Sequence, residues 1–185
     1  GLERVHLGGS LSGVFLGFSG SEVDGLLAAT PAGSSVYAAT GASASIASGR
    51  LSYALGLHGP CVSHDTACSS ALAAGHAALR AVQLNECVTG LVAAVNLILA
   101  PGVSIGFAIA GMTSMRGRSH TFDARADGYA RGEAIDVFVC RRGEGAAAEG
   151  RVGMVGSAIR QDGRSASRTA PNGQAQQGVL SASLA

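Results

Sequence analysis

Residues 59–72 read Gly-Pro-Cys-Val-Ser-His-Asp-Thr-Ala-Cys-Ser-Ser-Ala-Leu, the most informative segment of the chain. A short segment, residues 61–65, leads through small residues into an Ala- and Leu-rich run, residues 69–83. The first segment is a strand candidate and the second predicts a helix, with Cys68 at the turn between them. A helix N-terminus stabilises a thiolate through its unpaired N–H groups, so Cys68 is a candidate nucleophile. The alternative is a buried structural cysteine, the usual fate of a free cysteine.

The segments on either side extend the same alternation of strands and helices. We expect further strands at residues 14–18, 91–97, 135–140 and 152–159, and helices at residues 43–57 and from 174 onward. Residues 141–150 form a polar connection, after which strand 152–159 is placed to pair with strand 135–140. The pattern predicts an α/β sheet covered on its faces by helices.

The uncharged stretch from Cys87 to Met115 is long enough to cross a membrane. Asn96 and the dipeptide Pro101-Gly102 interrupt it, and that dipeptide is a turn signal. We therefore expect a buried strand, a turn and a buried helix instead of a membrane span.

Composition narrows the classes of function. The 185 residues are 47% hydrophobic and 14% charged, with a formal net charge of +1, so the chain fits one globular domain without the basic field of a nucleic-acid-binding protein. All 13 basic residues are arginine, which excludes a lysine-based mechanism from this segment. No cysteine pair has the C-x-x-C spacing of a zinc site, so no metal is expected. Both ends read as cut, which indicates a segment of a longer protein from a reducing, cytoplasmic compartment.

The sequence around Cys68 resembles the nucleophile motif of the β-ketoacyl synthase (ketosynthase) domains of polyketide synthases and multifunctional fatty acid synthases. The motif residues are Asp-Thr-Ala-Cys-Ser-Ser at 65–70. Other segments that resemble the family occur in family order: residues 13–17, 49–60, 106–107, 110–112, 121–123, 127–129, 131–133, 161–165 and 169–173. Many spaced motifs in one order are more specific than any single short pattern.

The resemblance implies a thiolase-like layered fold (αβαβα) that usually forms homodimers. It implies an acyltransferase: Cys68 accepts an acyl chain, which then undergoes decarboxylative Claisen condensation with a malonyl-type extender. Phe107 would line the acyl pocket. The substrates would arrive on the phosphopantetheine of an acyl carrier protein, with no other cofactor. The implied location is the cytoplasm, or a plastid in a eukaryote.

The family's two catalytic histidines, in His-Gly-Thr-Gly-Thr and Asn-x-Gly-His motifs, have no match here. Residues 1–185 are therefore expected to be a partial ketosynthase domain without the upstream start and the histidine-bearing C-terminal half, inactive alone. His76 is expected to be structural, and His64 stands where the family usually has an aliphatic residue. The rival interpretation is a non-catalytic scaffold or chain-length partner of the same fold. Acyl chain length, extender, pathway and parent type are left open.

Four charged residues, Asp123, Asp127, Arg131 and Glu133, cluster in one polar segment. Paired carboxylates of this kind sometimes perform acid–base catalysis. The favoured interpretation is structural, with these groups satisfying backbone polar atoms near the pocket.

Overall fold

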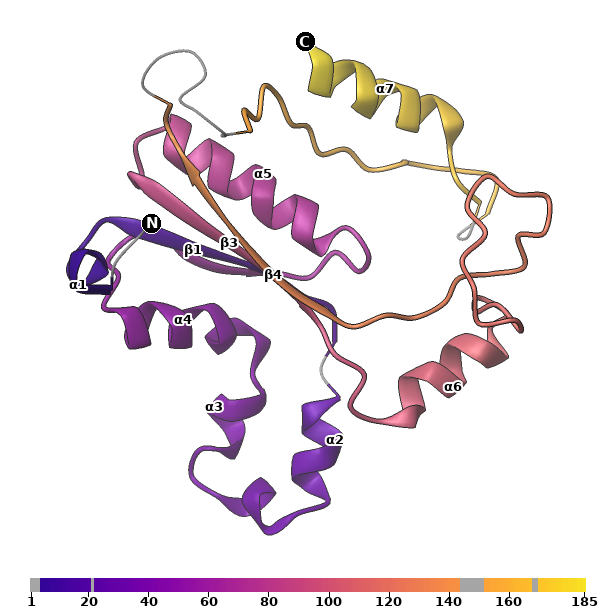
Figure 1. Cartoon of the computed structure of the whole chain (residues 1–185), viewed down its shortest axis with the longest axis horizontal. Helices are drawn as coiled ribbons and strands as arrows, with labels where there is room; N and C mark the ends of the chain where they lie inside the picture. Colours follow the sequence, from indigo (N-terminus) through magenta and orange to yellow (C-terminus); the bar gives the residue numbers. More distant parts are fainter. Residues whose placement is uncertain (1–3, 21, 144–151, 168–169) are drawn as a thin grey trace.

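The structure is a computed structural model that describes residues 4–20, 22–143, 152–167 and 170–185. One mixed sheet lies between helices, and a long irregular segment leads from the last strand to the C-terminal helix (Figure 1). The elements in chain order are α1 (Arg4–Leu7), β1 (Ser12–Gly17), α2 (Val23–Ala28), the 3₁₀ helix η1 (Pro31–Ser34), α3 (Ala38–Ala42), α4 (Ala44–Leu55), β2 (Cys61–His64), α5 (Ser70–Gln83), β3 (Thr89–Asn96), α6 (Pro101–Ile109), β4 (Ala134–Arg141) and α7 (Gly173–Leu184).

The sheet has the strand order β2-β1-β3-β4. β1, β2 and β3 are parallel, with Val14 beside both Cys61 and Leu91, whereas β4 runs antiparallel to β3. Parallel strands joined by helices place their carboxyl ends at one edge of the sheet. The segments that follow β1, β2 and β3 therefore start from the same edge.

β1 is central, and every residue of it is buried. Phe15 points to the face covered by α5, where it packs with Ala74, Ala78 and Val92. Val14 points to the opposite face, where it packs with Leu57 beyond the end of α4. Side chains of a strand alternate between faces, so a strand with apolar residues at both parities is covered on both sides.

The sequence predicted most of these elements. The strands containing Val14, Cys61, Leu91 and Val137 and the helices α4, α5 and α7 are confirmed within a few residues. α4 ends where Gly56 adopts a left-handed φ of 68°, which glycine does without steric cost.

Two predictions about the second half of the chain are wrong. Residues 152–159 form no strand and do not pair with β4. The side chains of α5 hold this segment instead: His76 Nδ1 lies 2.8 Å from Ser157 Oγ, and Arg80 donates to the Ser157 carbonyl at 3.5 Å. The segment consequently runs along the helix layer (Figure 1). Of the predicted polar connection, residues 144–150 lie outside the described residues.

The other error concerns α6. Pro101 does not make a turn but opens the helix at its first position, where a missing N–H costs nothing. None of the residues of α6 is buried, and Ile105 and Ile109 are exposed. Among the described residues, no helix combines the length and apolar character that crossing a bilayer needs.

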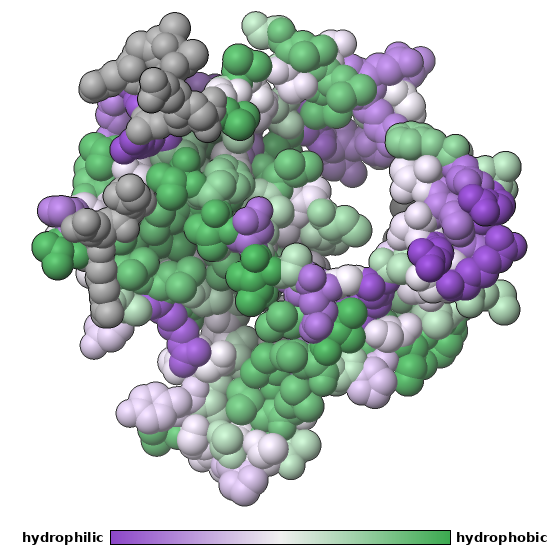
Figure 2. Space-filling model, in the orientation of Figure 1, coloured by the Kyte–Doolittle hydropathy of each residue, from purple (hydrophilic) through white to green (hydrophobic). Residues whose placement is uncertain are grey.

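The expected helical cover is incomplete over β4. Phe138 pairs with Val92 on the α5 face, so Ile135, Val137 and Val139 point to the opposite face. All three are exposed. Figure 2 shows apolar side chains gathered over the sheet region of the viewed face and polar side chains over the loop between α6 and β4.

Candidate active site

Cys68 lies in the connection between β2 and α5, at the edge where the parallel strands end. β2 ends at His64, and the first helical residue of α5 is Ser70, preceded by Ser69 as the N-cap. Cys68 thus stands two residues before the helix, and its side chain is exposed. The prediction of a presented thiol at the head of this helix is confirmed, and the alternative of a buried structural cysteine is wrong for Cys68.

The turn that presents Cys68 is built from hydrogen bonds of small polar side chains. Ser70 Oγ accepts from the Thr66 N–H at 2.9 Å and donates to the Ala67 carbonyl at 2.7 Å. Asp65 Oδ1 accepts from the Ala67 N–H at 3.1 Å. This bond, followed by one from the Ser19 side chain, lowers the pKa of Asp65 below its ordinary value. The turn is therefore held from both sides while the thiol stays outside the network.

Ala67, directly before Cys68, has a φ of 54°. A left-handed conformation costs an L-residue about 1–2 kcal/mol. Such strain persists only where surrounding contacts enforce it, and it concentrates at functional sites. The bonds to Ala67 from Asp65 and Ser70 supply that enforcement.

Gly17 brings β1 into direct contact with the first turn of α5. A Cβ built at this position would lie 2.5 Å from the Ser70 carbonyl oxygen and 2.7 Å from the Ala71 nitrogen. Only a residue without a side chain fits between this strand and this helix. A glycine in a strand, such as Gly17 in the run of residues 13–17, indicates that another backbone segment approaches closely. The neighbouring sequence does not show that this segment is α5.

The four cysteines differ in exposure. Cys61 and Cys68 are exposed, Cys87 is buried and Cys140 is partly buried. Burial raises the pKa of both Cys87 and Cys140. A raised pKa reduces the thiolate fraction, so these two are the weaker nucleophiles, and Cys61 is the exposed cysteine against which Cys68 must be compared.

Phe107 lies on α6 and is half-buried. Its ring centroid is 6.4 Å from that of Tyr129, with the planes tilted by 58°, and the Arg131 guanidinium carbon lies 5.5 Å from the centroid of the Phe107 ring. α6 follows β3 and the Cys68 turn follows β2, so both start from the same edge of the sheet. The structure places the two predicted site residues on separate elements at this edge.

The histidines present have other surroundings. His76 bonds to Ser157 through Nδ1, as a structural residue does. His64 Nε2 is buried and has no hydrogen-bond partner among the described residues, and burial lowers the pKa of His64. An unpaired buried polar atom destabilises a fold, which agrees with a position better suited to an aliphatic side chain.

The carboxylates of the acidic cluster have separate partners, which supports the structural interpretation. Asp123 pairs with Arg125 at 2.7 Å, and Asp127 accepts from Ser114 Oγ at 2.6 Å. Glu133 Oε1 accepts from the Ile98 N–H at 2.7 Å. Each carboxylate thus has its own partner, and the acid–base alternative has no support. Within the described part of the chain, no group of three His, Cys, Asp or Glu side chains is arranged to bind a metal ion.

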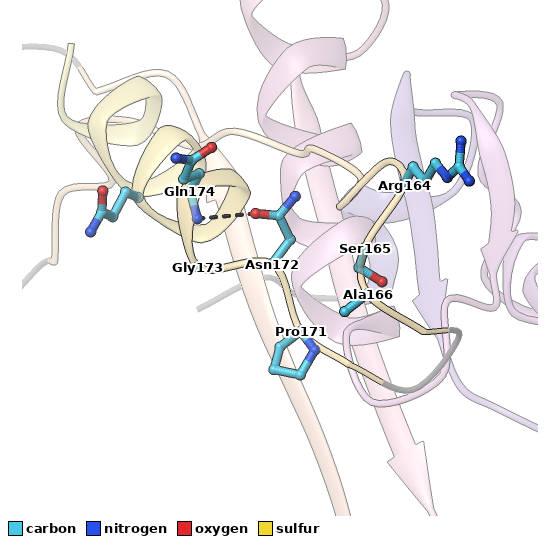
Figure 3. A pocket seen from close by; sticks show the side chains of 8 residues that line it. Arg164, Ser165, Ala166, Pro171, Asn172, Gly173 and Gln174 are labelled. Atoms are coloured by element: carbon cyan, nitrogen blue, oxygen red, sulfur yellow. Dashed lines mark hydrogen bonds between the residues drawn. The ribbon is translucent and has the colours of Figure 1, made fainter.

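A pocket of about 500 Å³ lies at the start of α7. Its lining residues include Arg164, Ser165, Asn172 and Gln177. Asn172 caps α7 by accepting from the N–H groups of Gln174 and Ala175, and Figure 3 shows the Arg164 side chain directed away from that cap. The lining of this pocket includes no cysteine or histidine.

Comparison with known proteins gives a consistent result. A family model described as the N-terminal domain of β-ketoacyl synthase matches residues 1–146. The chain is 40% identical over 187 residues to a mycocerosic acid synthase-like polyketide synthase of Mycolicibacterium smegmatis, in a match that covers 100% of this chain and 9% of that protein. It is 40% identical over 192 residues to the spectinabilin polyketide synthase system protein NorC of Streptomyces orinoci, with 100% and 8% covered.

Among solved structures, the chain is similar to the ketosynthase from module 6 of the bacillaene synthase from Bacillus subtilis 168. The TM-score is 0.81 at 32% identity, over 96% of this chain and 31% of that one. The layered fold is therefore the thiolase-like fold of ketosynthase domains, present in part. The chain spans only a small share of the length of the curated relatives that it matches.

Proposed function

Because the chain belongs to the β-ketoacyl synthase family, we propose that its parent protein is an acyltransferase that extends carrier-bound acyl chains in polyketide biosynthesis. The observation that carries the proposal is the exposed Cys68 thiol on a left-handed turn at the head of α5. Polyketide synthase relatives at 40% identity favour that pathway over fatty acid synthesis.

The first half-reaction is an acyl transfer. The Cys68 thiolate attacks the carbonyl carbon of an acyl thioester on the phosphopantetheine of an acyl carrier protein. The carbonyl π electrons move onto oxygen, where we expect the backbone N–H of Cys68 to act as one donor to the oxyanion. Collapse of this intermediate breaks the bond to the phosphopantetheine sulfur, which leaves as a thiolate and takes up from solvent the proton that Cys68 had lost, and the acyl group stays on Cys68. Covalent catalysis thereby divides one condensation into two easier transfers.

In the second half-reaction a malonyl-type thioester loses carbon dioxide. The electron pair of the broken bond forms a carbanion that attacks the acyl carbon on Cys68. The Cys68 thiolate leaves, and the product is a β-ketoacyl thioester. The two histidine motifs that the family uses here have no match in residues 1–185, so we expect this segment alone not to condense. We propose no resident cofactor, and we place the parent protein in the cytoplasm on family membership.

Homodimerisation is part of the proposal. β2 stands at the end of the strand order, so one edge of it carries no neighbouring strand within the described sheet. Open edges of this kind pair readily with another chain. A second copy of the domain, pairing at β2, would bring two Cys68 turns near one interface.

Acyl transfer is tested on the full-length parent by mass spectrometry. Incubation with an acyl thioester should add one acyl mass, and Cys68→Ala should abolish that adduct without changing the melting curve. Cys61→Ala is the matched control, since it removes the other exposed thiol and should retain the adduct. An adduct that survives in Cys68→Ala contradicts the nucleophile, and a wild type without any adduct favours the scaffold.

A further inference from the structure

The segment that carries Phe107 is fastened by a network of charged and polar groups. Glu22, which precedes α2, lies against the start of α6 although the two are distant in sequence. Its Oε2 accepts from the N–H groups of Leu99 and Ala100, each at 2.6 Å. These N–H groups belong to the residues just before α6, whose backbone donors lack helical partners. A carboxylate at this end of a helix is also favoured by the helix dipole.

Arg131 completes the network from the loop before β4. Its Nη2 lies 3.6 Å from Glu22 Oε1, and the two side chains are only 13% and 9% exposed. Its Nη1 donates to Ser104 Oγ at 2.5 Å, in the first turns of α6. Its guanidinium carbon lies 5.5 Å from the centroid of the Phe107 ring, within the range of a cation–π contact. One side chain therefore contacts the helix, the aromatic ring and the carboxylate that caps the helix.

Further bonds fix the loop on which Arg131 stands. Glu133 accepts from the Ile98 N–H at 2.7 Å, and the Asn96 side chain donates to the Gly132 carbonyl. The connection between β3 and α6 is thus tied to the loop before β4. α6 itself buries no residue and contributes little packing of its own, so these polar contacts determine where it lies.

We propose that Arg131 and Glu22 are positioning residues that fix α6, so that Phe107 forms a rigid wall and limits the bulk of the acyl group accepted at Cys68. The inference rests on the proposed function, because it assigns Phe107 to the acyl pocket. Tyr129 and Arg131 are both neighbours of the Phe107 ring. A ring held in this way cannot retract to admit a long or branched acyl chain.

The test uses the full-length parent with Arg131→Gln, and Arg116→Gln as the matched control. Arg116 forms a 3.6 Å ion pair with Asp127 in the loop between α6 and β4, and its side chain is 60% exposed. Ser104→Ala is a milder variant that removes one bond to Arg131 and keeps the ion pair, in case Arg131→Gln fails to fold.

Two measurements distinguish a positioning role of Arg131 from an effect on protein stability alone. Amide hydrogen exchange over residues 103–109 should accelerate at least about tenfold in Arg131→Gln and less in Ser104→Ala, with no change in Arg116→Gln. The second readout is the rate of Cys68 acylation by a branched or long acyl thioester, divided by the rate with an acetyl thioester. This ratio should rise at least about threefold in Arg131→Gln, less in Ser104→Ala and not at all in Arg116→Gln.

Unchanged exchange in both Arg131→Gln and Ser104→Ala would overturn the positioning role. Faster exchange with an unchanged ratio of acylation rates would overturn the specificity role. Both results leave the proposed acyl transfer intact, because wild-type Cys68 still forms its adduct. A wild type that forms no adduct with any thioester would overturn the proposed function and the specificity role together.

Discussion

Replacing Gly17 with alanine should misplace the nucleophile without touching it. The added Cβ would lie 2.5 Å from the Ser70 carbonyl oxygen, 2.6 Å from the Ser70 carbonyl carbon and 2.7 Å from the Ala71 nitrogen. All three are backbone atoms, so no flexible side chain can move aside. To reach ordinary contact, β1 and the head of α5 must separate by about 0.9 Å.

That displacement acts at the turn that holds Cys68, because Ser70 Oγ also bonds to Thr66 and Ala67. A misplacement of about 1 Å can cost about 100-fold in rate. Overpacking of a close contact destabilises a fold by about 1–3 kcal/mol. We therefore expect Gly17→Ala to acylate between about tenfold and 100-fold more slowly than the wild type, with a lower melting temperature.

The assay is rapid mixing of the full-length parent with an acyl thioester, followed by mass spectrometry of the Cys68 peptide. Gly41→Ala is the control: Gly41 lies in the helix α3, and the Cβ that alanine would add there meets no atom within 4 Å. That change should leave the rate within about twofold and stabilise the helix by up to about 1 kcal/mol. A Gly17→Ala protein that acylates at the wild-type rate would refute the argument from close approach.

Three further predictions concern stability. Because φ at residue 67 is 54°, Ala67→Gly should melt no lower than the wild type, whereas Ala67→Val should lower the free energy of unfolding by about 1–3 kcal/mol. Equal melting temperatures for the two variants would contradict backbone strain at this position. Burial lowers the pKa of His64, so the unfolded state takes up a proton first as pH falls through the ordinary value of 6.5, and wild-type stability should decline below that pH. His64→Val should lack this decline, and melting curves that shift in parallel with pH would exclude the effect. Hydrogen bonds from the N–H groups of Ala100 and then Leu99, with the charge of Arg131, lower the pKa of Glu22. The contribution of ionised Glu22 to folding stability is therefore complete above the ordinary pKa of 4.5 and is lost as the pH falls through the lowered pKa. Glu22→Gln should reduce the fall in melting temperature at acidic pH. If the fall is as large as in the wild type, other groups cause it.

Local patterns were sufficient for the elements on either side of Cys68 and for its position at the head of α5. The short strand β2, the small residues of the turn and the Ala/Leu periodicity of α5 are each decided within a few residues, so Cys68 was placed correctly at the head of the helix. The order of the family motifs along the chain then identified the fold.

Local patterns failed where a segment's partner lies far away in the sequence. Residues 152–159 have the composition of a strand, yet the polar side chains of His76 and Arg80 on α5 hold them away from β4. α6 is apolar in sequence, as a buried helix is, yet it is exposed and fastened by Glu22 and Arg131.

The sequence by itself determined the strand–turn–helix unit around Cys68, the membership of the family and the alternation of strands with helices, since hydrophobic period and turn chemistry are properties of neighbouring residues. Only the tertiary structure decided that Gly17 meets the head of α5, and that Glu22 and Arg131 together hold the helix that carries Phe107. Such contacts join residues remote in the chain, and their formation depends on how the sheet brings the ends of its strands to one edge.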